Sequence, residues 1–156
     1  MAKAAALEAL RDRLASLGTA AIAHGLVAVV IPPGDVLPVA STLKREGCDL
    51  LLDVTAVDWL GRTPRFEVVW HFYSTAQAVR VRVKTRVGEE APVVDSLTRL
   101  YGSAAFMERE CHDMYGVGFR GNDDMRPILL YEGFVGHPLR KDYAKDHEQP
   151  LVTYRE

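Results

Sequence analysis

The stretch "AVRVRVKTRV", residues 78–87, decides the fold class of this chain. Valines there alternate with Arg80, Arg82, Lys84 and Arg86. Successive side chains of a strand point to opposite faces, so the pattern predicts a strand with one face on an apolar core and a row of positive charge on the other. The basic row fits two interpretations: a solvated sheet face, or a docking surface for an acidic partner protein.

Two further strand patterns precede this stretch. "DLLLDVTAVDW", residues 49–59, and "RFEVVWHFYS", residues 65–74, are rich in the β-branched and aromatic residues that favour strands. The separators "LGRTP" and "TAQ" are short. Strands joined by such short turns pair antiparallel, so we expect a three-strand antiparallel meander.

The first part of the chain predicts a helix, two strands and a second helix. Leucines at spacings of three and four indicate an amphipathic N-terminal helix that Gly18 can close. These leucines are Leu7, Leu10, Leu14 and Leu17. "AAIAHG" and "LVAVVI" meet at Gly25 and predict a short hairpin. After "PPGD", Asp35 can cap a helix that continues through Leu43.

Beyond the meander, Pro92 suits a first helical turn, and the apolar residues after it predict a short helix. Those residues are Val93, Val94, Leu97 and Leu100. A further helix is expected from about residue 104 to residue 115, ended by Gly116. Residues 117–156 show no sustained period, although large apolar side chains are scattered through them. So long an irregular segment is unusual inside a self-sufficient domain, so we expect an extended tail that wraps a partner.

Together these elements predict an α/β fold of the α+β two-layer kind. The expected order is helix, two strands, helix and the three-strand antiparallel meander in one mixed sheet, then helices and an extended C-terminal tail. Residues 1–116 would form the compact α/β domain. Residues 117–156 would form the irregular, partner-wrapping tail of the same domain, which suits a chain of 156 residues.

Composition argues against several functional classes. A formal net charge of −2 gives no electrostatic reason to bind nucleic acid. The longest apolar run, "LVAVVI", is far shorter than the roughly 20 residues that span a bilayer, and the N-terminus lacks a signal-peptide core. With only two cysteines, the chain alone cannot supply the four thiolates that an iron-sulfur cluster normally needs.

The stretch "MERECHDMYGVGFRG", residues 107–121, contains the glycine spacing of a dinucleotide site in Gly116, Gly118 and Gly121. Such a site works because a strand precedes the glycines and a helix begins at them. Here a helix comes first. We therefore expect these glycines to end a helix and form turns rather than to bind a nucleotide.

The same stretch carries a cluster of charged residues. Glu108 and His112 lie four residues apart on one face of the expected helix, and Glu110 and Asp113 lie three apart on another. Zinc needs at least three protein ligands, and the H-E-x-x-H arrangement is absent. We therefore expect the carboxylates to pair with basic groups. The expected partners include Arg109 and Arg126. A free-standing metal-dependent hydrolase using Glu108, His112 and Asp113 is the alternative.

"ERECHDMYGVGF" and "MRPILL", within residues 108–130, together with "EGFVGHPLRKDY", residues 132–143, resemble the signature region of the thirty-kilodalton subunit family of respiratory complex I. The likeness extends upstream to "DVTAVDW" and "RFEVVWHFYS" and covers roughly residues 50–143. The matching signature positions are Glu108, Arg109, Glu110, Asp113, Met114, Tyr115, Arg126, Ile128, Leu129 and Leu130. One position departs from the family, because Asn122 stands where His or Lys is usual.

The resemblance implies a non-redox structural subunit in the peripheral arm of a proton-translocating NADH:quinone oxidoreductase, on the cytoplasmic side of the bacterial inner membrane. FMN, iron-sulfur clusters and quinone would lie in partner subunits and none in this chain. The implied partners are the quinone-site D subunit and the cluster-bearing B and I subunits, with membrane association only through the complex. The implied docking residues are His137, Pro138, Leu139, Arg140, Lys141, Asp142 and Tyr143. The nearest alternative is the equivalent subunit of a membrane-bound hydrogenase or a ferredoxin-dependent oxidoreductase.

Overall fold

Three antiparallel strands form the centre of the sheet in the computed structural model, which describes residues 2–149. They are β3 (Leu50–Asp58), β4 (Phe66–Ser74) and β5 (Val79–Val87). Strand β4 pairs antiparallel with β3 on one side and with β5 on the other. The predicted meander is therefore confirmed.

Strand β5 has the two-sided character that its alternation predicts. Val79, Val81 and Val83 are buried, whereas Arg80 and Arg86 on the opposite face are exposed. One face of the sheet therefore carries the core, and the other carries the basic row.

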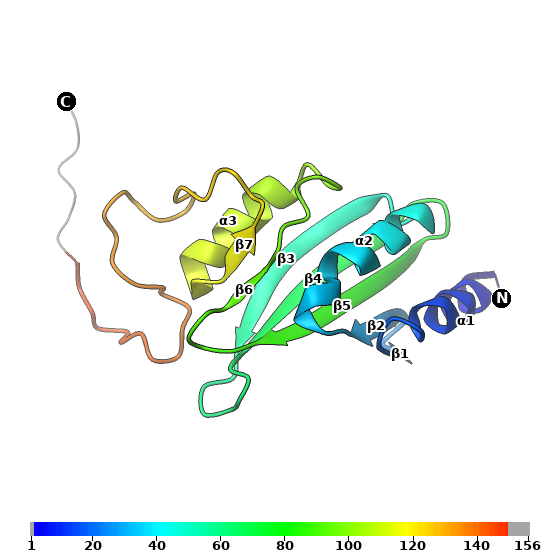
Figure 1. Ribbon diagram of the computed structural model, residues 1–156, viewed down its shortest axis with the longest axis horizontal. Coiled ribbons are helices and arrows are strands. Elements are labelled where there is room, and N and C mark those ends of the chain that lie inside the picture. The colour runs from blue at the N-terminus through cyan, green and yellow to red at the C-terminus, as the bar shows by residue number, and fades with distance from the viewer. Residues whose placement is uncertain (1, 150–156) are drawn as a thin grey trace.

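The sheet is completed by the predicted hairpin. Strand β2 (Leu26–Val30) pairs parallel with β5, and β1 (Thr19–Ala23) pairs antiparallel with β2. The order β1-β2-β5-β4-β3 gives a mixed five-stranded sheet (Figure 1). Parallel strands need a crossover connection, and a helix lies in the segment that connects β2 to the meander.

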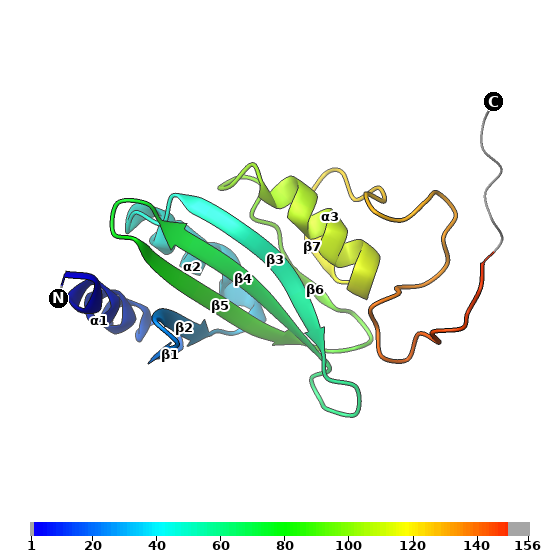
Figure 2. The ribbon, with the colours of Figure 1, turned by 180° about the vertical axis from the view of Figure 1, so that it is seen from behind.

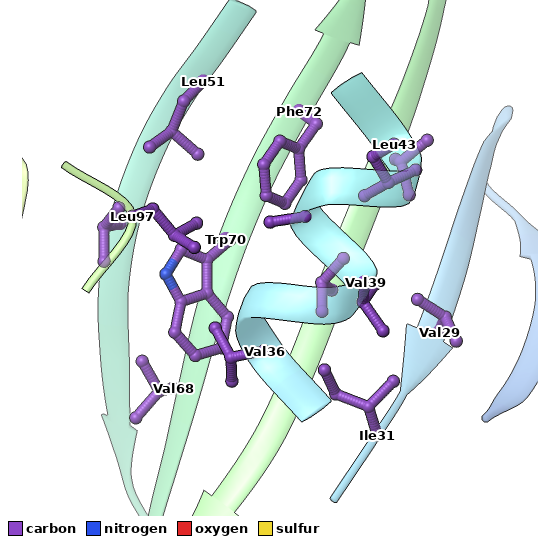
Figure 3. Packing of buried hydrophobic residues seen from close by; sticks show 14 of the residues in the cluster. Val29, Ile31, Val36, Val39, Leu43, Leu51, Val68, Trp70, Phe72 and Leu97 are labelled. Carbon is purple, nitrogen blue, oxygen red and sulfur yellow. The ribbon is translucent and has the colours of Figure 1, made fainter. Parts of the chain in front are cut away.

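That helix, α2 (Val36–Arg45), covers one face of the sheet through an apolar stripe. A short 3-10 turn, η1 (Pro33–Asp35), leads into it, and Asp35 takes the predicted N-cap position without a side-chain capping bond. The buried stripe consists of Val36, Val39, Ala40 and Leu43. Figure 3 shows this stripe packed over Trp70 and Phe72 of β4, with Leu97 beside the indole.

The N-terminal helix is also confirmed, as α1 (Ala2–Leu14), but it ends before Gly18. Leu7, Leu10 and Leu14 are buried in the core. Gly18 is required for a different reason, since a Cβ there would collide with the carbonyl oxygen of Val30 in β2. The glycine serves a close approach of two segments and not the end of the helix.

The prediction of a helix starting at Pro92 is wrong. Residues 93–95 form strand β6 (Val93–Asp95), which pairs parallel with β7 (Gly118–Arg120) in a two-stranded sheet. Val94 is 2% exposed and Val93 is 39% exposed, which is the two-sided burial of a strand. Because β7 belongs to this pair, the irregular chain begins at residue 121 rather than at residue 117.

Helix α3 (Ala104–Tyr115) ends at Gly116, as predicted. It lies beside β3 at the edge of the sheet (Figures 1 and 2). The described part of the tail, residues 121–149, contains neither helix nor strand and curls around the end of α3. No helix within the described residues is long and apolar enough to cross a bilayer. The predicted α+β fold is confirmed.

Candidate functional site

The C-terminal end of α3 is organised around Gly116, which has a φ of 74° and donates its N–H to the carbonyl oxygen of His112. A left-handed glycine is the usual way to end a helix. A Cβ at this position would also collide with the side chains of His137 and Arg140. Gly118 lies in β7, and Gly121 has a φ of 93° in the turn that follows. Gly116 is therefore a helix cap and Gly121 a turn residue, as predicted, whereas Gly118 is the first residue of a strand.

Glu108 is a fully buried carboxyl group that touches no cation within the described residues. Its Oε1 accepts the Leu97 N–H at 2.7 Å, and its Oε2 accepts the Ser96 hydroxyl at 2.8 Å and the Asn122 amide at 2.9 Å. Burial raises the pKa of Glu108, and these three hydrogen bonds oppose the shift without reversing it. The carboxyl joins α3 to the segment after β6 and to the start of the tail.

The Asp113 side chain binds the backbone of the apolar run of the signature, residues 128–130. The Asp113 Oδ2 accepts the N–H groups of Ile128, Leu129 and Leu130 at 2.8, 3.0 and 3.4 Å. Burial raises the pKa of Asp113, but the three N–H donors lower it more, and the net shift is downward. This 4% exposed carboxylate therefore fixes the path of the tail against α3.

The prediction that Glu108 and Asp113 pair with Arg109 or Arg126 is wrong, because backbone and neutral donors surround both carboxyl groups. Arg109 instead donates to the carbonyl oxygens of Arg126 at 2.8 Å and Pro127 at 3.0 Å. Both Arg109, at 3.6 Å, and Arg126, at 2.8 Å, form ion pairs with Asp124. Arg109 of α3 thus holds the tail through two backbone carbonyls and Asp124, whereas the Arg126–Asp124 pair lies within the tail.

Three carbonyl groups at the end of α3 accept hydrogen bonds from the expected docking segment. The His137 Nδ1 lies 3.0 Å from the backbone carbonyl oxygen of Asp113. The Leu139 N–H donates to the carbonyl oxygen of Met114 at 3.1 Å, and the Arg140 Nε donates to the carbonyl oxygen of Tyr115 at 2.6 Å. The last carbonyls of a helix lack partners within the helix and carry partial negative charge. Donors from the tail, including one cation, satisfy these carbonyls.

A second anchor of the tail is centred on Arg65, which is 2% exposed. Its guanidinium binds Asp58 through two hydrogen bonds of 2.8 and 2.7 Å and also contacts Glu89 at 2.6 Å and Asp142 at 2.8 Å. The Lys141 N–H donates to Asp58 Oδ2 at 2.8 Å. The bonded guanidinium lowers the pKa of Asp58 and of Asp142. This network ties the tail to the turn end of the β3–β4 hairpin.

The sequence interpretation missed the Arg65 network, although a signal for it exists. Asp58 ends β3 and Arg65 immediately precedes β4, and the Trp59 N–H bonds the Arg65 carbonyl oxygen at 2.9 Å. Opposite charges on either side of the turn of a predicted hairpin are expected to lie side by side. The participation of Asp142, far along the chain, carried no such signal.

The remaining signature and docking residues lie on or near the surface. Glu110 is exposed, Met114 and Tyr115 are half-buried, and Pro138 and Tyr143 are half-buried in the tail. Several large apolar side chains of the tail remain in solvent. They are Ile128 at 37%, Leu129 at 61%, Tyr131 at 39%, Val135 at 70% and Leu139 at 53% exposed.

The proposed hydrolase ligands do not converge. Glu108 is directed to Ser96 and Leu97, Asp113 to the tail backbone, and the His112 Nδ1 lies 3.0 Å from the Val117 carbonyl oxygen. Within residues 2–149, no group of three or more His, Cys, Asp or Glu side chains is placed to hold a metal ion. The arrangement contradicts a metal site built from these three residues.

A sequence model of one family, described as "Respiratory-chain NADH dehydrogenase, 30 Kd subunit", matches residues 29–149 of this chain. The chain belongs to this family. Among the relatives is the C 2 subunit of NADH-quinone oxidoreductase from Rhizobium meliloti (strain 1021), 43% identical over 137 residues, which cover 86% of this chain and 71% of the relative. Another is the C subunit of NADH-quinone oxidoreductase from Geotalea uraniireducens (strain Rf4), 40% identical over 121 residues, which cover 77% of this chain and 74% of the relative.

One solved structure agrees with the family assignment, and a second has a similar fold. A trypsin-resistant fragment of Nqo5 is 30% identical, with a TM-score of 0.67, covering 80% of this chain and 99% of the fragment. A chain of the membrane-bound sulfane sulfur reductase, an archaeal respiratory membrane complex, is 23% identical with a TM-score of 0.79. The match covers 88% of this chain and 85% of that chain. The second likeness concerns the fold alone.

The departure from the family signature at Asn122 now has a structural context. The amide of Asn122 donates to the buried carboxyl of Glu108. A Lys or His⁺ at this position would bring a positive charge to that carboxyl, whereas the amide brings only a dipole. In this member of the family the signature carboxyl is therefore held by neutral donors.

Proposed function

We propose that this chain is a non-redox structural subunit of the peripheral arm of a proton-translocating NADH:quinone oxidoreductase. Its role is to hold the quinone-reducing module in working geometry. Membership of the 30 Kd subunit family supports the complex. The use of two signature carboxylates supports the role, because Glu108 and Asp113 accept hydrogen bonds from backbone and neutral donors and so join α3 to neighbouring segments. Enzymatic activity then belongs to the assembled complex.

The tail gives this proposal its physical content. Two anchors, Asp113 on α3 and Arg65 at the hairpin, fix the ends of a surface loop between residues 130 and 141. Phe134 in this loop packs against Tyr131, with ring centroids 5.4 Å apart, and against Tyr143 just beyond the loop, with ring centroids 6.1 Å apart. A loop held in this way presents its exposed apolar side chains without a large ordering cost on binding.

The partners, cofactors and location follow from the same proposal. The tail docks on the quinone-site D subunit and the cluster-bearing B and I subunits, and FMN, iron-sulfur clusters and quinone reside in partner subunits. The complex places the chain on the cytoplasmic side of the bacterial inner membrane. Respiratory electron transfer depends on fixed placement of centres, and a rigid scaffold preserves that placement.

The equivalent subunit of a related membrane-bound complex is the second candidate. The fold likeness to a chain of the archaeal sulfane sulfur reductase favours it, since the same architecture occurs in a complex named for a different substrate. Identification of the co-purifying subunits distinguishes the two candidates. A flavin- and NADH-binding module should accompany only the first.

The docking role of the tail is tested by Leu139→Asp with Leu60→Asp as the matched control. Leu139 is 53% exposed in the tail, and Leu60 is 48% exposed in the β3–β4 turn. Both leucines already face solvent, so neither variant should unfold the isolated chain. We expect Leu139→Asp to reduce the assembled complex on native gels of the membranes, and Leu60→Asp to leave it unchanged.

The scaffold role requires a second readout on the same membranes. Arg140→Ala should also weaken assembly, because it removes the donor on the Tyr115 carbonyl oxygen. The complex that still forms should keep its iron-sulfur reduction potentials. An intact complex with a shifted cluster potential would refute the scaffold role, and equal assembly of the two leucine variants would refute docking through the tail.

A further inference from the structure

The basic face of the sheet is not used by the tail and its anchors. Figure 2 shows the side of the sheet opposite α2, where α3 lies beside β3 and no helix covers β4 and β5. This open face carries Arg80, Arg82, Lys84 and Arg86 of β5. Cross-strand pairing sets His71 opposite Arg82 and Tyr73 opposite Arg80. We propose that this open face docks an acidic segment of a second neighbouring polypeptide in the same complex.

The cations of the open face are only partly neutralised within the chain. Glu67, which is 7% exposed, pairs with Lys84 at 3.0 Å and with Arg86 at 3.5 Å. Within residues 2–149, Arg80 and Arg82 form no ion pair. The unpaired charge is therefore concentrated at one end of the row.

Arg82 also has an unsatisfied donor. Its Nε is shut off from solvent and has no hydrogen-bond acceptor among the described residues. A buried donor without a partner is unfavourable. If the side chain turns outward onto a carboxylate, its guanidinium can form the two-point pairing that arginine and carboxylate prefer. An acidic partner therefore satisfies both the charge and the donor.

Apolar side chains border the same end of the row. Leu50, which is 44% exposed, pairs across the sheet with Tyr73, and Tyr73 in turn pairs with Arg80. A hollow of about 390 Å³ next to them is lined by His24, Gly25, Tyr73, Ala78 and Arg80. Arginine, tyrosine and aliphatic contacts in one patch are typical of protein interfaces.

The chemistry of the face favours a protein over other anionic partners. Glu67 of β4 lies opposite Arg86 and Asp53 of β3 lies opposite His71, so carboxylates interrupt the positive surface. Burial, and then the Arg82 charge, lowers the pKa of His71, so its ring adds no positive charge near neutral pH. Side chains two apart on a strand are roughly 7 Å apart, which matches carboxylates one turn apart on a helix, roughly 6 Å.

The inference rests on the proposed function, and the experiment uses the complex purified through this chain. Arg80→Lys and Arg82→Lys each place a primary amine on the open face and keep its charge. A zero-length carbodiimide then couples an amine to any carboxylate in direct contact. Arg99→Lys is the control, because Arg99 is exposed in a hollow shared with Leu37 of α2, on the helix-covered side of the sheet.

We expect mass spectrometry to find cross-links from residues 80 and 82 to Asp or Glu of another subunit, and none from residue 99. The double variant Arg80→Glu, Arg82→Glu should lower retention of this chain in the complex severalfold at low salt, where charge is least screened, whereas Arg99→Glu should not. Cross-links that stay within this chain, in a complex that is intact, overturn the docking face and leave the proposed function standing.

Two other outcomes are also decisive. If no other subunit co-purifies with the chain, the docking face and the proposed function both fail. If the isolated chain sediments with phosphatidylglycerol vesicles and the double glutamate variant does not, the face binds an anionic membrane, and the protein partner is refuted.

Discussion

Helices α2 and α3 pack against the molecule in different ways. Helix α2 contacts the sheet through aliphatic side chains such as Val39 and Leu43, both of which are fully buried. Helix α3 buries two carboxyl groups, Glu108 and Asp113, and each accepts three hydrogen bonds from other segments. Apolar packing tolerates small shifts of position, whereas the hydrogen bonds of a buried carboxyl specify one arrangement of donors.

The difference indicates how each region should fail. The core around α2 is continuous, so the loss of one large side chain weakens the whole domain. The tail is held by separate polar contacts along its length, so the loss of one should release the adjacent segment while the sheet remains folded. Three measurements follow from this contrast, and the largest effect is expected in the core.

Trp70→Ala should lower the free energy of unfolding by about 3–5 kcal/mol. Trp70 is fully buried on β4, between α2 and Leu97 (Figure 3), so its removal leaves a cavity at the centre of the domain. Urea denaturation followed by circular dichroism measures the change. Phe106→Ala is the control, because Phe106 is 60% exposed on α3, and its change should be close to zero. Equal losses for the two variants would show that the indole is not central to the core.

Arg65→Met should cost about 3 kcal/mol, because it leaves the buried Asp58 carboxylate without its cation. The loss should first appear in the tail, as faster trypsin cleavage after Arg140 and Lys141, while the sheet keeps its circular dichroism. Arg62→Met is the control, since Arg62 is exposed and stacks on Trp59.

A second substitution separates the ion pair from simple packing. Adding Asp58→Leu to Arg65→Met removes the stranded carboxylate, so the double variant should recover part of the lost stability. It should not restore protection of the tail against trypsin, because the Lys141 N–H then lacks Asp58 and the Asp142 carboxylate lacks Arg65. Recovery of both properties would mean that the tail is held elsewhere.

The same contrast explains which parts of the fold could be predicted. Alternation in β5 and leucine spacing in α1 are local patterns, and the structure confirms both elements. Strand β6 was predicted to be a helix because its partner, β7, lies beyond α3 in the sequence. Pairing between short segments far apart in the sequence produces no repeating pattern of apolar residues, so tertiary contacts determine that residues 93–95 form a strand.

In the candidate site, the family resemblance identified important residues, but their hydrogen-bond and ion-pair partners could not be predicted from the sequence. Glu108 and Asp113 were singled out, but their expected ion pairs were wrong, because sequence alone does not show that a helix face is buried against backbone donors. The Arg65 network was missed for a related reason. One member of it, Asp142, lies in the tail, where no pattern sets the spacing.

The smallest effect concerns pH and the tail anchor. The pKa values of Asp58 and Asp142 are lowered in the folded chain by Arg65. Their stabilising contribution is therefore fully present above the unfolded aspartate pKa of about 3.9 and is lost as the pH falls through the lower folded values. The Lys141 amide proton reports this directly, since it donates to Asp58.

In an NMR titration, the Lys141 amide should therefore keep its native shift down to about pH 4 and change only below it. The Leu139 amide, which donates to the Met114 carbonyl oxygen, provides a control bonded to a group that does not titrate. Asp142→Asn should cost less than about 1 kcal/mol, because the Asp142 side chain is 48% exposed and solvent weakens its ion pair. A Lys141 transition centred above about pH 4 would mean that Arg65 does not hold Asp58 ionised, and the second tail anchor would then be neutral hydrogen bonding like that of Glu108.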